Sequence, residues 1–523
     1  MDFVKTQIQM ERKKGVVSAQ TSFDEAYNLP DYLPDIYSVI LAGGEIRLDE
    51  VRPGSEQVAV RGAVLFRVLY KTDQNEWKIS SMNGEFPFQE TLSAPELGEF
   101  DMVSIEPVLE DLAVQIVNSR KLNIRALIEL KAVIRERYDI EVPVETDTDV
   151  PLEVLEEEEE FLELRYCGRE NCHIREEIRV PSNKPNIRQS LWQQAQVFGV
   201  NERISAGMIE IEGEIEVFPV YVGEENESLQ WFTAKIPFRC EFEIPEADSA
   251  MIPCVVIRVQ GLSCSVGSDE DGESRVIWAD ADLYADIRLY EERRQELIRD
   301  IYALDRNLVL EKEHVSVPVL RRRNESKCRL NDTILIESRG SDILQICAGF
   351  GSAQIDRIRM EDDGILAEGA VRIRILYLTD NDSAPLEAAE GVIPFQYLME
   401  IPGIRPQDEV ELQHSLEALS FLMKNSREAE IQAVVSLRVL VSGTYELELI
   451  SGIQEEDFKI EELNTQPSVV GLTLDEKDSL WEIAKKYHTT REQIRQINQL
   501  KDDHVSRGMK ILLIRQLPQK AIC

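Results

Sequence analysis

The chain contains few histidines and none of the short motifs that are typical of catalytic sites. Among its 523 residues there are 5 His, and none lies in an HExxH motif or a recognisable catalytic triad. These are His173, His314, His414, His488 and His504. Residues 348–351 are glycine-rich but lack the Lys-Ser/Thr of a phosphate loop. With 97 acidic residues some glycosidase-like pair is always available, so their number decides nothing. The sequence therefore predicts a non-enzymatic protein.

Long apolar runs are also missing. No segment approaches the roughly 20 apolar residues that span a bilayer, so we expect no transmembrane segment. Residues 1–14 have no basic start followed by an apolar core, which argues against a secretory signal. From these two absences we expect the protein to stay in the cytoplasm where it is made.

Basic residues are scarce relative to acidic ones. Lys and Arg number 58 against 97 Asp and Glu, which gives a net charge of −39. Such a surface repels nucleic acid and anionic membranes, so neither is an expected partner. The acidic surface mainly predicts solubility through mutual repulsion, and a dedicated acidic binding surface is the alternative interpretation.

The first part of the chain has no cysteine. All 8 Cys lie at or after Cys167, at places that differ from one repeat to the next. A disulfide or metal framework would be expected to repeat with the fold, so the sequence predicts reduced cysteines that serve in packing. Cys167, Cys172 and His173 form a C-x4-C-H cluster without a second ligand pair, so we predict no metal site and no cofactor.

What the sequence does contain is one pattern repeated three times. The glycines Gly62, Gly213 and Gly369 are each followed by partly alternating apolar residues and a tyrosine. Three further landmarks keep nearly constant distances from each glycine. They are an aromatic-proline signal at Pro87, Pro237 and Pro394, a strand alanine at Ala126, Ala279 and Ala433, and a polar residue at Asp35, Asn186 and Asp342. The chain is therefore a tandem array of one domain type, repeated about every 150 residues.

Each repeat has the composition of an antiparallel β domain. Residues 58–70 and 122–134 largely alternate apolar and polar side chains, residues 107–116 form another mixed apolar run between them, and turn residues break these strands. The fold class predicted is mainly β: three tandem antiparallel β-sandwich-like repeats followed by a small βααβ module. Residues 267–273 resemble a calcium loop in composition but lack its ligand spacing, so we interpret them as a hairpin turn.

The predicted boundaries alternate repeats with linkers. Residues 16–140, 180–290 and 330–445 form the repeats, and 469–515 the C-terminal module. Residues 141–179 and 446–468 are expected to be acidic linkers, since residues 156–160 are five consecutive glutamates. Residues 291–329 are expected to be a helical linker, because Leu297, Ile298 and Ile301 share one helical face.

The C-terminal module shows strand, helix, helix, strand. A capping box at residues 479–482 opens the first helix. Its apolar stripe is Leu480, Ile483, Ala484 and Tyr487. The second helix opens either with Thr489 and Glu492 or with Thr490 and Gln493, and residues 510–514 close the module as a strand. Trp481 lies beside the stripe and is expected to be partly exposed, either as a rim residue of the small core or as a binding contact.

The C-terminal module resembles a LysM domain at residues 478–490, at Ile494, Asn498 and Leu500, and at residues 508–511. LysM is the module that commonly binds N-acetylglucosamine-containing glycans. Lys477 and His488 stand where that family usually has glycine. Three acidic β repeats followed by a LysM domain are similar to the clostridial spore-coat morphogenetic family SipL, whose repeats are SPOCS domains.

The resemblance to SipL implies a function in spore-coat assembly. In that family the protein acts in the mother cell, binds the coat ATPase SpoIVA through its LysM domain, and helps the coat encase the forespore. For this chain it implies a binding surface on the LysM loops. The residues expected there are Lys477, Asp478, Ser479, Leu480, Trp481, Asn498, Leu500 and His504.

Two other functions remain open. The same LysM surface would suit a peptidoglycan-binding protein of the cell wall or spore cortex, and a wall hydrolase is a third hypothesis that lacks a visible catalytic domain. For Lys477, Asp478 and Ser479, the alternative to a binding role is helix capping and loop solvation. For His504, the alternative is an ordinary surface position in a loop.

Overall fold

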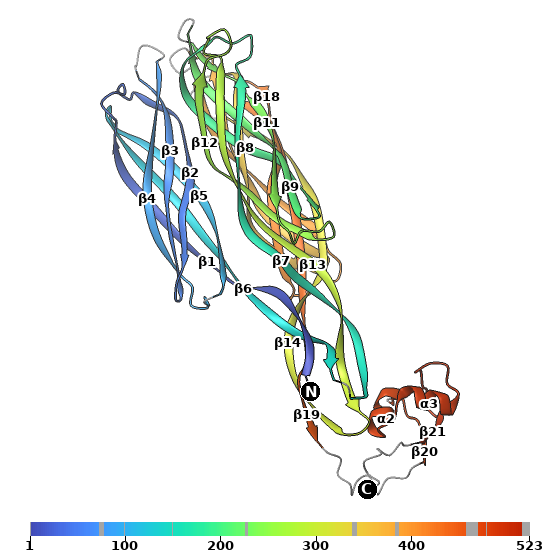
Figure 1. Ribbon diagram of the computed structural model, residues 1–523. Helices are drawn as coiled ribbons and strands as arrows, with labels where there is room; N and C mark the ends of the chain where they lie inside the picture. Colours follow the sequence, from blue (N-terminus) through green and yellow to red (C-terminus); the bar gives the residue numbers. More distant parts are fainter. Residues whose placement is uncertain are drawn as a thin grey trace.

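The computed structural model describes residues 2–72, 78–98, 100–148, 150–224, 228–336, 342–381, 386–456, 469–476 and 478–514. Over these residues the chain is almost entirely β, with two short helices near its C-terminal end (Figure 1). The predicted mainly β fold class is confirmed. Each repeat consists of two small antiparallel sheets that enclose an apolar core.

Repeat 1 establishes the pattern that the other two follow. One sheet has the strand order β1-β6-β5, and the other has the order β2-β3-β4. The strands are β1 (Asp2–Asn28), β2 (Ser38–Pro53), β3 (Gln57–Lys71), β4 (Ile79–Ser93), β5 (Met102–Asn118) and β6 (Lys121–Asp147). In β6, alternate residues from Leu122 to Leu130 point inward and are buried, as the alternation in the sequence predicts.

Repeats 2 and 3 use the same topology. In repeat 2 the sheets are β12-β13-β7 and β10-β9-β11, with β8 also paired to β9. Its strands are β7 (Leu152–Arg179), β8 (Ile187–Ser205), β9 (Met208–Gly223), β10 (Leu229–Trp231), β11 (Ala234–Glu243), β12 (Ile252–Gly267) and β13 (Val276–Ala303). In repeat 3 the sheets are β14-β19-β18 and β15-β16-β17. Its strands are β14 (Asn307–Leu335), β15 (Ile343–Glu361), β16 (Gly364–Thr379), β17 (Leu386–Glu400), β18 (Glu409–Asn425) and β19 (Glu428–Glu456).

The repeated glycine and the repeated aromatic-proline signal meet in the structure. Gly62 pairs with Phe88 across two strands, as Gly213 pairs with Phe238 and Gly369 with Phe395. A Cβ atom on Gly62 would lie 2.9 Å from the Phe88 ring and 2.3 Å from the Arg47 carbonyl oxygen. The phenylalanine ring therefore covers the glycine, and this cross-strand packing explains why both landmarks recur together.

A β-bulge recurs as well. The ladder skips one residue at Glu110 in β5, at Gln260 in β12 and at Glu417 in β18. A bulge bends a strand and increases its twist, so the equivalent edge strand of each repeat is curved at the same point. Repetition of this irregularity shows that the three repeats share detailed backbone geometry as well as topology.

The repeats contact one another cyclically around a common axis. The fifth residue after the repeated glycine is Arg67 in repeat 1, Phe218 in repeat 2 and Arg374 in repeat 3. Arg67 donates to the Gln193 carbonyl of repeat 2, and Arg374 donates to the Ala42 carbonyl of repeat 1 at 2.5 Å. Phe218 instead packs edge-on against Phe350 of repeat 3, at a centroid distance of 5.5 Å.

Six long strands extend beyond the repeats and form a stalk (Figure 1). The strands pair two by two, as β1 with β6, β7 with β13, and β14 with β19. Apolar side chains from all three pairs form a shared core between them. This core contains Ile8, Met10, Ile140, Val142, Phe161, Leu297, Val317, Leu447 and Leu449. The stalk therefore binds the three repeats into one body.

The helical linker predicted over residues 291–329 is wrong. Residues up to Ala303 belong to β13, and β14 begins at Asn307. Leu297 lies in the stalk core, whereas Ile298 and Ile301 pack in a second cluster against Ile450. Leu297 and Ile298 alternate faces as neighbours in a strand do, and a ladder irregularity between Ile298 and Asp300 places Ile301 on the same face as Ile298. Long-range pairing with β7 and burial on two sides override the helical preference of the local sequence.

The prediction of an acidic linker over residues 141–179 is also wrong, because almost all of these residues belong to strands. Residues 141–147 end β6, and residues 152–179 are β7, so the five glutamates lie within a strand. Their charges are compensated across the ladder, because Arg294 pairs with Glu160 at 2.9 Å and Arg299 pairs with Glu157 at 3.2 Å. In the third linker, residues 446–456 end β19, and residues 457–468 lie outside the described residues.

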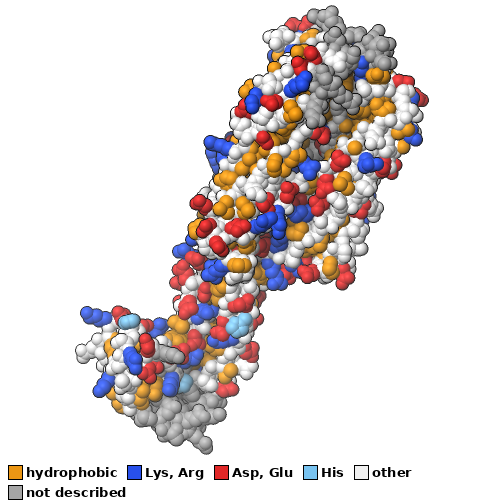
Figure 2. All heavy atoms as spheres, turned by 180° about the vertical axis from the view of Figure 1, so that it is seen from behind, with side chains coloured by type: hydrophobic (Ala, Val, Ile, Leu, Met, Phe, Trp, Pro, Cys, Tyr) orange, Lys and Arg blue, Asp and Glu red, His pale blue; other side chains and the backbone are white. Residues whose placement is uncertain are grey.

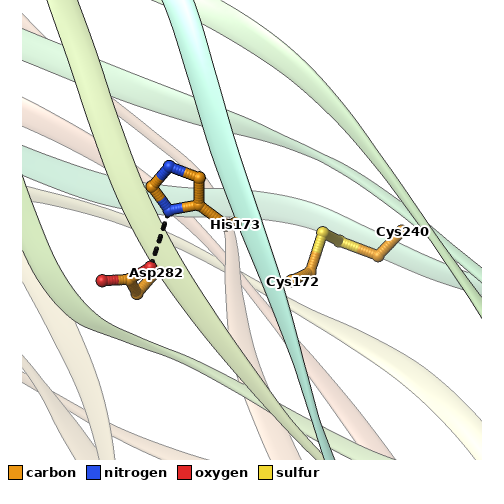
Figure 3. Close-up of a disulfide and its surroundings, with 4 residues drawn as sticks. All are labelled: Cys172, His173, Cys240 and Asp282. Carbon is orange, nitrogen blue, oxygen red and sulfur yellow. Dashed lines mark hydrogen bonds and ion pairs between the residues drawn. A yellow bond between two sulfur atoms is a disulfide. The ribbon is translucent and has the colours of Figure 1, made fainter.

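The expectation that all cysteines are reduced is also wrong. Cys172 in β7 and Cys240 in β11 form a disulfide that joins the two sheets of repeat 2 (Figure 3). The neighbouring His173 points the other way and hydrogen-bonds Asp282 at 2.8 Å, so it takes no part in a cysteine cluster. Ala19 and Ser326 occupy the positions in β1 and β14 that correspond to Cys172, so the bridge belongs to one repeat and shows no periodicity.

Candidate functional site

The C-terminal module is a compact βααβ unit at the end of the stalk (Figure 1). Its elements are β20 (Val469–Thr473), α2 (Leu480–Lys486), α3 (Arg491–Asn498) and β21 (Lys510–Ile514). The predicted capping residue Ser479 accepts a hydrogen bond from the Glu482 backbone N–H at 3.1 Å. At the second helix Thr490 caps Gln493 at 3.1 Å, so the second of the two predicted alternatives is confirmed.

The small core is built as the apolar stripe predicts. Leu480, Ile483 and Ala484 are buried, and Tyr487 packs partly buried against them. Asn498 holds the end of α3 to β21, because its amide donates to the Leu512 carbonyl at 2.7 Å and accepts from the Leu512 N–H at 2.6 Å. Asn498 thus has a structural role in closing the module.

One face of the module packs against the tip of the stalk. Trp481 donates its indole N–H to Asp300 Oδ2 at 2.7 Å, and its ring meets the Tyr302 ring edge-on at 4.9 Å. Lys485 donates to both oxygens of the same carboxylate, at 2.6 and 2.7 Å. Charge-assisted hydrogen bonds of this kind are about twice as strong as neutral ones, so Asp300 anchors α2 to the stalk.

A second set of contacts extends this interface to α3. The Tyr302 hydroxyl donates to the Thr489 carbonyl at 2.8 Å in a buried position. Burial and the nearby Glu153 carboxylate raise the Tyr302 pKa, so the phenol stays a hydrogen-bond donor at neutral pH. Arg491 stacks over the Trp481 ring at 5.1 Å and pairs with Glu153 at 3.8 Å.

The prediction that Trp481 is partly exposed is therefore wrong. Its side chain keeps only 6% of its surface accessible, because it is covered by Tyr302 and Asp300. These two residues lie about 180 positions earlier in the chain. The sequence does not reveal these two residues, because they lie in the segment 291–329 that its local pattern predicts to be a helical linker, and nothing in their own neighbourhood indicates a contact with the module.

The other predicted site residues fall into two groups. Leu480 is buried in the module core and Leu500 is partly buried against it, so both are largely packing residues. Asp478 and Ser479 lie exposed in the loop before α2, where Asp478 accepts from the Asp475 N–H at 2.7 Å. His504 is exposed in the loop before β21. Lys477 lies outside the described residues.

His488 lies at the point where α2 turns toward α3. Its φ angle is 49°, in the left-handed region that favours glycine, and LysM domains usually have glycine at this position. Its ring nitrogen Nδ1 lies 3.4 Å from the Ala303 carbonyl of the stalk. The side chain thus adds a contact with the stalk that a glycine could not make.

The described residues show no arrangement that suggests a metal centre or a membrane span. Among them, no group of three or more His, Cys, Asp or Glu side chains is placed to hold a metal ion. Neither of the helices in the described part of the chain is long and apolar enough to cross a bilayer.

Fold and site together define a tandem-repeat β protein that carries a glycan-binding type of module at the end of a stalk. Comparison with protein families agrees: a model described as the SPOCS domain of SipL matches residues 35–117, 186–267 and 342–424, and a LysM domain model matches residues 475–513. The chain therefore has the architecture of the SipL family, and the predicted resemblance is confirmed. Neither the curated proteins nor the solved structures yielded a match.

The SPOCS and LysM matches support a sporulation coat protein that carries a LysM module. SPOCS and LysM are non-catalytic domain families. Each SPOCS match begins near the start of β2, β8 or β15 and ends with β5, β12 or β18. The long strands that build the stalk lie outside the matched segments, so the stalk is a feature that the family match alone does not describe.

Proposed function

We propose that this chain assembles the spore coat from the mother-cell side of the forespore, and that its LysM domain docks on the coat ATPase SpoIVA. The observation that carries the proposal is a LysM module held at the end of a stalk by one face, with its loops uncovered. Such a module is presented to a partner at a defined orientation, while the three repeats remain a separate body.

The docking surface we propose is smaller than the whole set of predicted residues. It consists of the exposed loop residues Asp478, Ser479 and His504, with Leu500 at their edge. Trp481 is excluded as a direct contact, because the stalk already covers it. A rigidly held loop surface loses less conformational freedom on binding than a tethered module would.

The three repeats add a multivalent component to this function. Several weak surfaces on one chain gain effective concentration once one of them has docked. In this arrangement the LysM domain supplies the specific contact with the ATPase, and the repeats supply further contacts along the growing coat.

Glycan binding through the same loops is the second candidate function. LysM modules commonly take N-acetylglucosamine-containing glycans, and the proposed surface is uncovered here. In that case the ligand is cortex or wall peptidoglycan.

A paired assay separates the two functions. The full-length chain and its His504→Glu variant are each tested for retention of purified SpoIVA and for sedimentation with peptidoglycan. We expect the native chain to retain SpoIVA and the variant to bind it roughly fivefold more weakly, because a rim or loop contact contributes about 1 kcal/mol. Lys510→Glu, at an exposed position in β21, introduces a larger charge change outside the loops and serves as the control.

If the native chain sediments with peptidoglycan and fails to retain SpoIVA, the glycan function takes its place. If Lys510→Glu weakens SpoIVA retention as much as His504→Glu does, the loops are not the docking surface.

A further inference from the structure

The loop of residues 499–509 connects α3 to β21 and carries two residues of the proposed docking surface, Leu500 and His504. Leu500 and Val505 pack partly buried against the module core, whereas residues 501–504 between them are exposed. Backbone hydrogen bonds join both ends of the loop to the rest of the module. The position of the exposed middle therefore depends on contacts made by side chains.

Asp503 anchors this exposed middle to α3. Its Oδ2 accepts a hydrogen bond from Arg491 Nη1 at 3.2 Å, and its Oδ1 lies 3.4 Å from Arg495 Nε. The two arginines are four residues apart, so they are neighbours on one face of the helix. Because Asp503 directly precedes His504, these two ion pairs restrain the docking residue through its neighbour.

Arg491 also reaches the stalk. Its Nη2 donates to the Val154 carbonyl at 3.4 Å, and its Nε lies 3.8 Å from the Glu153 carboxylate. Both of these residues belong to β7. A guanidinium presents five N–H donors in a rigid planar fork, so one arginine can bond to the loop and to the stalk at the same time.

Other contacts hold Arg491 in this bridging position. Its guanidinium stacks over the Trp481 ring at 5.1 Å, and Trp481 is bonded in turn to Asp300 of the stalk. Arg491 is the first residue of α3, and two positions earlier the Thr489 carbonyl accepts the Tyr302 hydroxyl at 2.8 Å. The start of α3 is thus fastened to the stalk by both its backbone and its first side chain.

The second docking loop, before α2, is held in a different way. Asp478 accepts from the Asp475 N–H, and Ser479 caps α2, so the hydrogen bonds described for these two residues stay inside the LysM domain. The link to the stalk through an arginine therefore distinguishes loop 499–509 from its neighbour.

From this geometry we propose that Arg491 is a positioning residue through which the stalk fixes the orientation of loop 499–509. The inference rests on the proposed function, since that function gives the loop its docking role. A loop tied to the stalk presents His504 in one orientation and loses less conformational freedom when a partner binds. The long strands of the repeats thereby contribute to docking without touching the partner.

Hydrogen exchange in the full-length chain tests the coupling without a partner. The amides of Leu500, His504, Gly508 and Met509 are hydrogen-bonded, so exchange in residues 499–509 reports opening of the loop. Arg491→Gln should speed this exchange about fivefold, because partly exposed ion pairs are individually weak. Asp503→Asn should have a similar effect while it leaves the contacts between α3 and the stalk in place. Exchange in residues 475–479 should not change.

A double-variant comparison shows whether the stalk acts through Arg491. Asp300→Ala, which releases α2 from the stalk, should also speed exchange in residues 499–509, but it should add nothing once Arg491 is replaced by glutamine. Arg495→Gln is the matched control, because its described ion pair is with Asp503 of the loop. In the Arg495→Gln background, Asp300→Ala should still speed the exchange.

Partner binding is measured separately, with purified SpoIVA as the probe. Arg491→Gln should bind SpoIVA about fivefold more weakly than the native chain does. Arg491→Lys should recover little of this loss, because a lysine supplies one ammonium group in place of the fork that reaches both the loop and the stalk.

The two measurements separate this inference from the proposed function. The inference is overturned if Asp300→Ala leaves residues 499–509 unchanged, if its effect adds fully to that of Arg491→Gln, or if Arg491→Gln speeds residues 475–479 equally. Equal SpoIVA binding by the native chain and Arg491→Gln overturns it as well. If the exchange is coupled but no chain retains SpoIVA, the coupling stands and the proposed docking on SpoIVA fails.

Discussion

A single carboxylate, Asp300, holds the LysM domain against the stalk by accepting hydrogen bonds from both Trp481 and Lys485. Its side chain is only 13% exposed, so it is well shielded from water and from salt. Tryptophan is enriched at binding hot spots, but here the contact with Asp300 buries Trp481 between the LysM domain and the stalk. The packing of the LysM domain against the stalk therefore depends on a residue outside the domain.

Replacement of Asp300 should release this joint. Asp300→Ala removes the acceptor of both hydrogen bonds and leaves Trp481 and Lys485 unpaired, at a cost of about 2–3 kcal/mol. We expect hydrogen exchange in residues 299–303 and in α2 to become at least about tenfold faster. Glu292→Ala, at an exposed position on the same strand β13, is the control and should leave both segments unchanged. Equal exchange in both variants would show that the LysM domain is held by other contacts.

The repeated tyrosines Tyr70, Tyr221 and Tyr377 predict an alkaline loss of stability. Tyr221 donates to the Pro185 carbonyl at 3.1 Å, and burial raises its pKa to about 12. Burial also raises the pKa values of the other two. An unfolded tyrosine ionises near pH 10, so the stabilisation is complete below about pH 10 and is lost as the pH rises through the folded pKa.

Denaturation midpoints measured between pH 8 and pH 12 test this prediction. The native chain should lose stability above about pH 10, and Tyr221→Phe, which has no proton to lose, should lose less. Absorbance of phenolate at 295 nm provides the independent measurement, because the buried tyrosines should ionise only at higher pH. Identical pH profiles for the two chains would contradict a buried Tyr221 phenol.

At the scale of elements, repeat 2 differs from its neighbours by a covalent bond. The disulfide between Cys172 and Cys240 joins β7 of one sheet to β11 of the other. A bridge across the two sheets restricts the unfolded chain, which typically stabilises a domain by about 2–4 kcal/mol. Within the described residues, repeats 1 and 3 contain no such bridge.

Counting thiols tests the disulfide directly. The chain has 8 Cys, and the denatured protein should show two more reactive thiols after reduction than before it. Reduction should also lower the denaturation midpoint of the native chain, whereas Cys172→Ser/Cys240→Ser should have the lower midpoint under both conditions. Eight reactive thiols without reductant, in protein purified under oxidising conditions, would contradict the bridge.

The elements also show what the sequence could predict. Alternation, turn residues and constant spacing suffice for the strands inside each repeat, because these features arise from local pattern and from burial on one side. The capping residues Ser479 and Thr490 likewise report local structure. The stalk strands could not be predicted in this way, since Glu157 and Glu160 are compensated by Arg299 and Arg294 only once the ladder is formed. The same is true of the site, where the cover of Trp481 depends on the stalk.

At the scale of the whole molecule, one network of charged side chains joins the three repeats. Acidic and basic side chains are interspersed over the surface, with basic side chains near the middle of the body (Figure 2). On the axis, Glu11 and Arg135 of repeat 1, Arg288 of repeat 2 and Glu411 of repeat 3 form a closed network. Because it draws on all three repeats, this network reports on the assembly of the ring.

Breaking the network at one residue should therefore destabilise the whole body. Arg288→Met leaves Glu11 and Glu411 buried with one guanidinium, Arg135, between them, and removing one partner of a buried ion pair costs about 3–5 kcal/mol. The double variant Arg288→Met/Glu411→Met removes the second charge as well and should recover part of this loss. Arg258→Met, at a more exposed ion pair, should cost less than about 1 kcal/mol. The stabilities of the four chains are compared by their urea midpoints. The network does not hold the three repeats together if Arg258→Met lowers the stability as much as Arg288→Met does. The same conclusion follows if the double variant is no more stable than Arg288→Met.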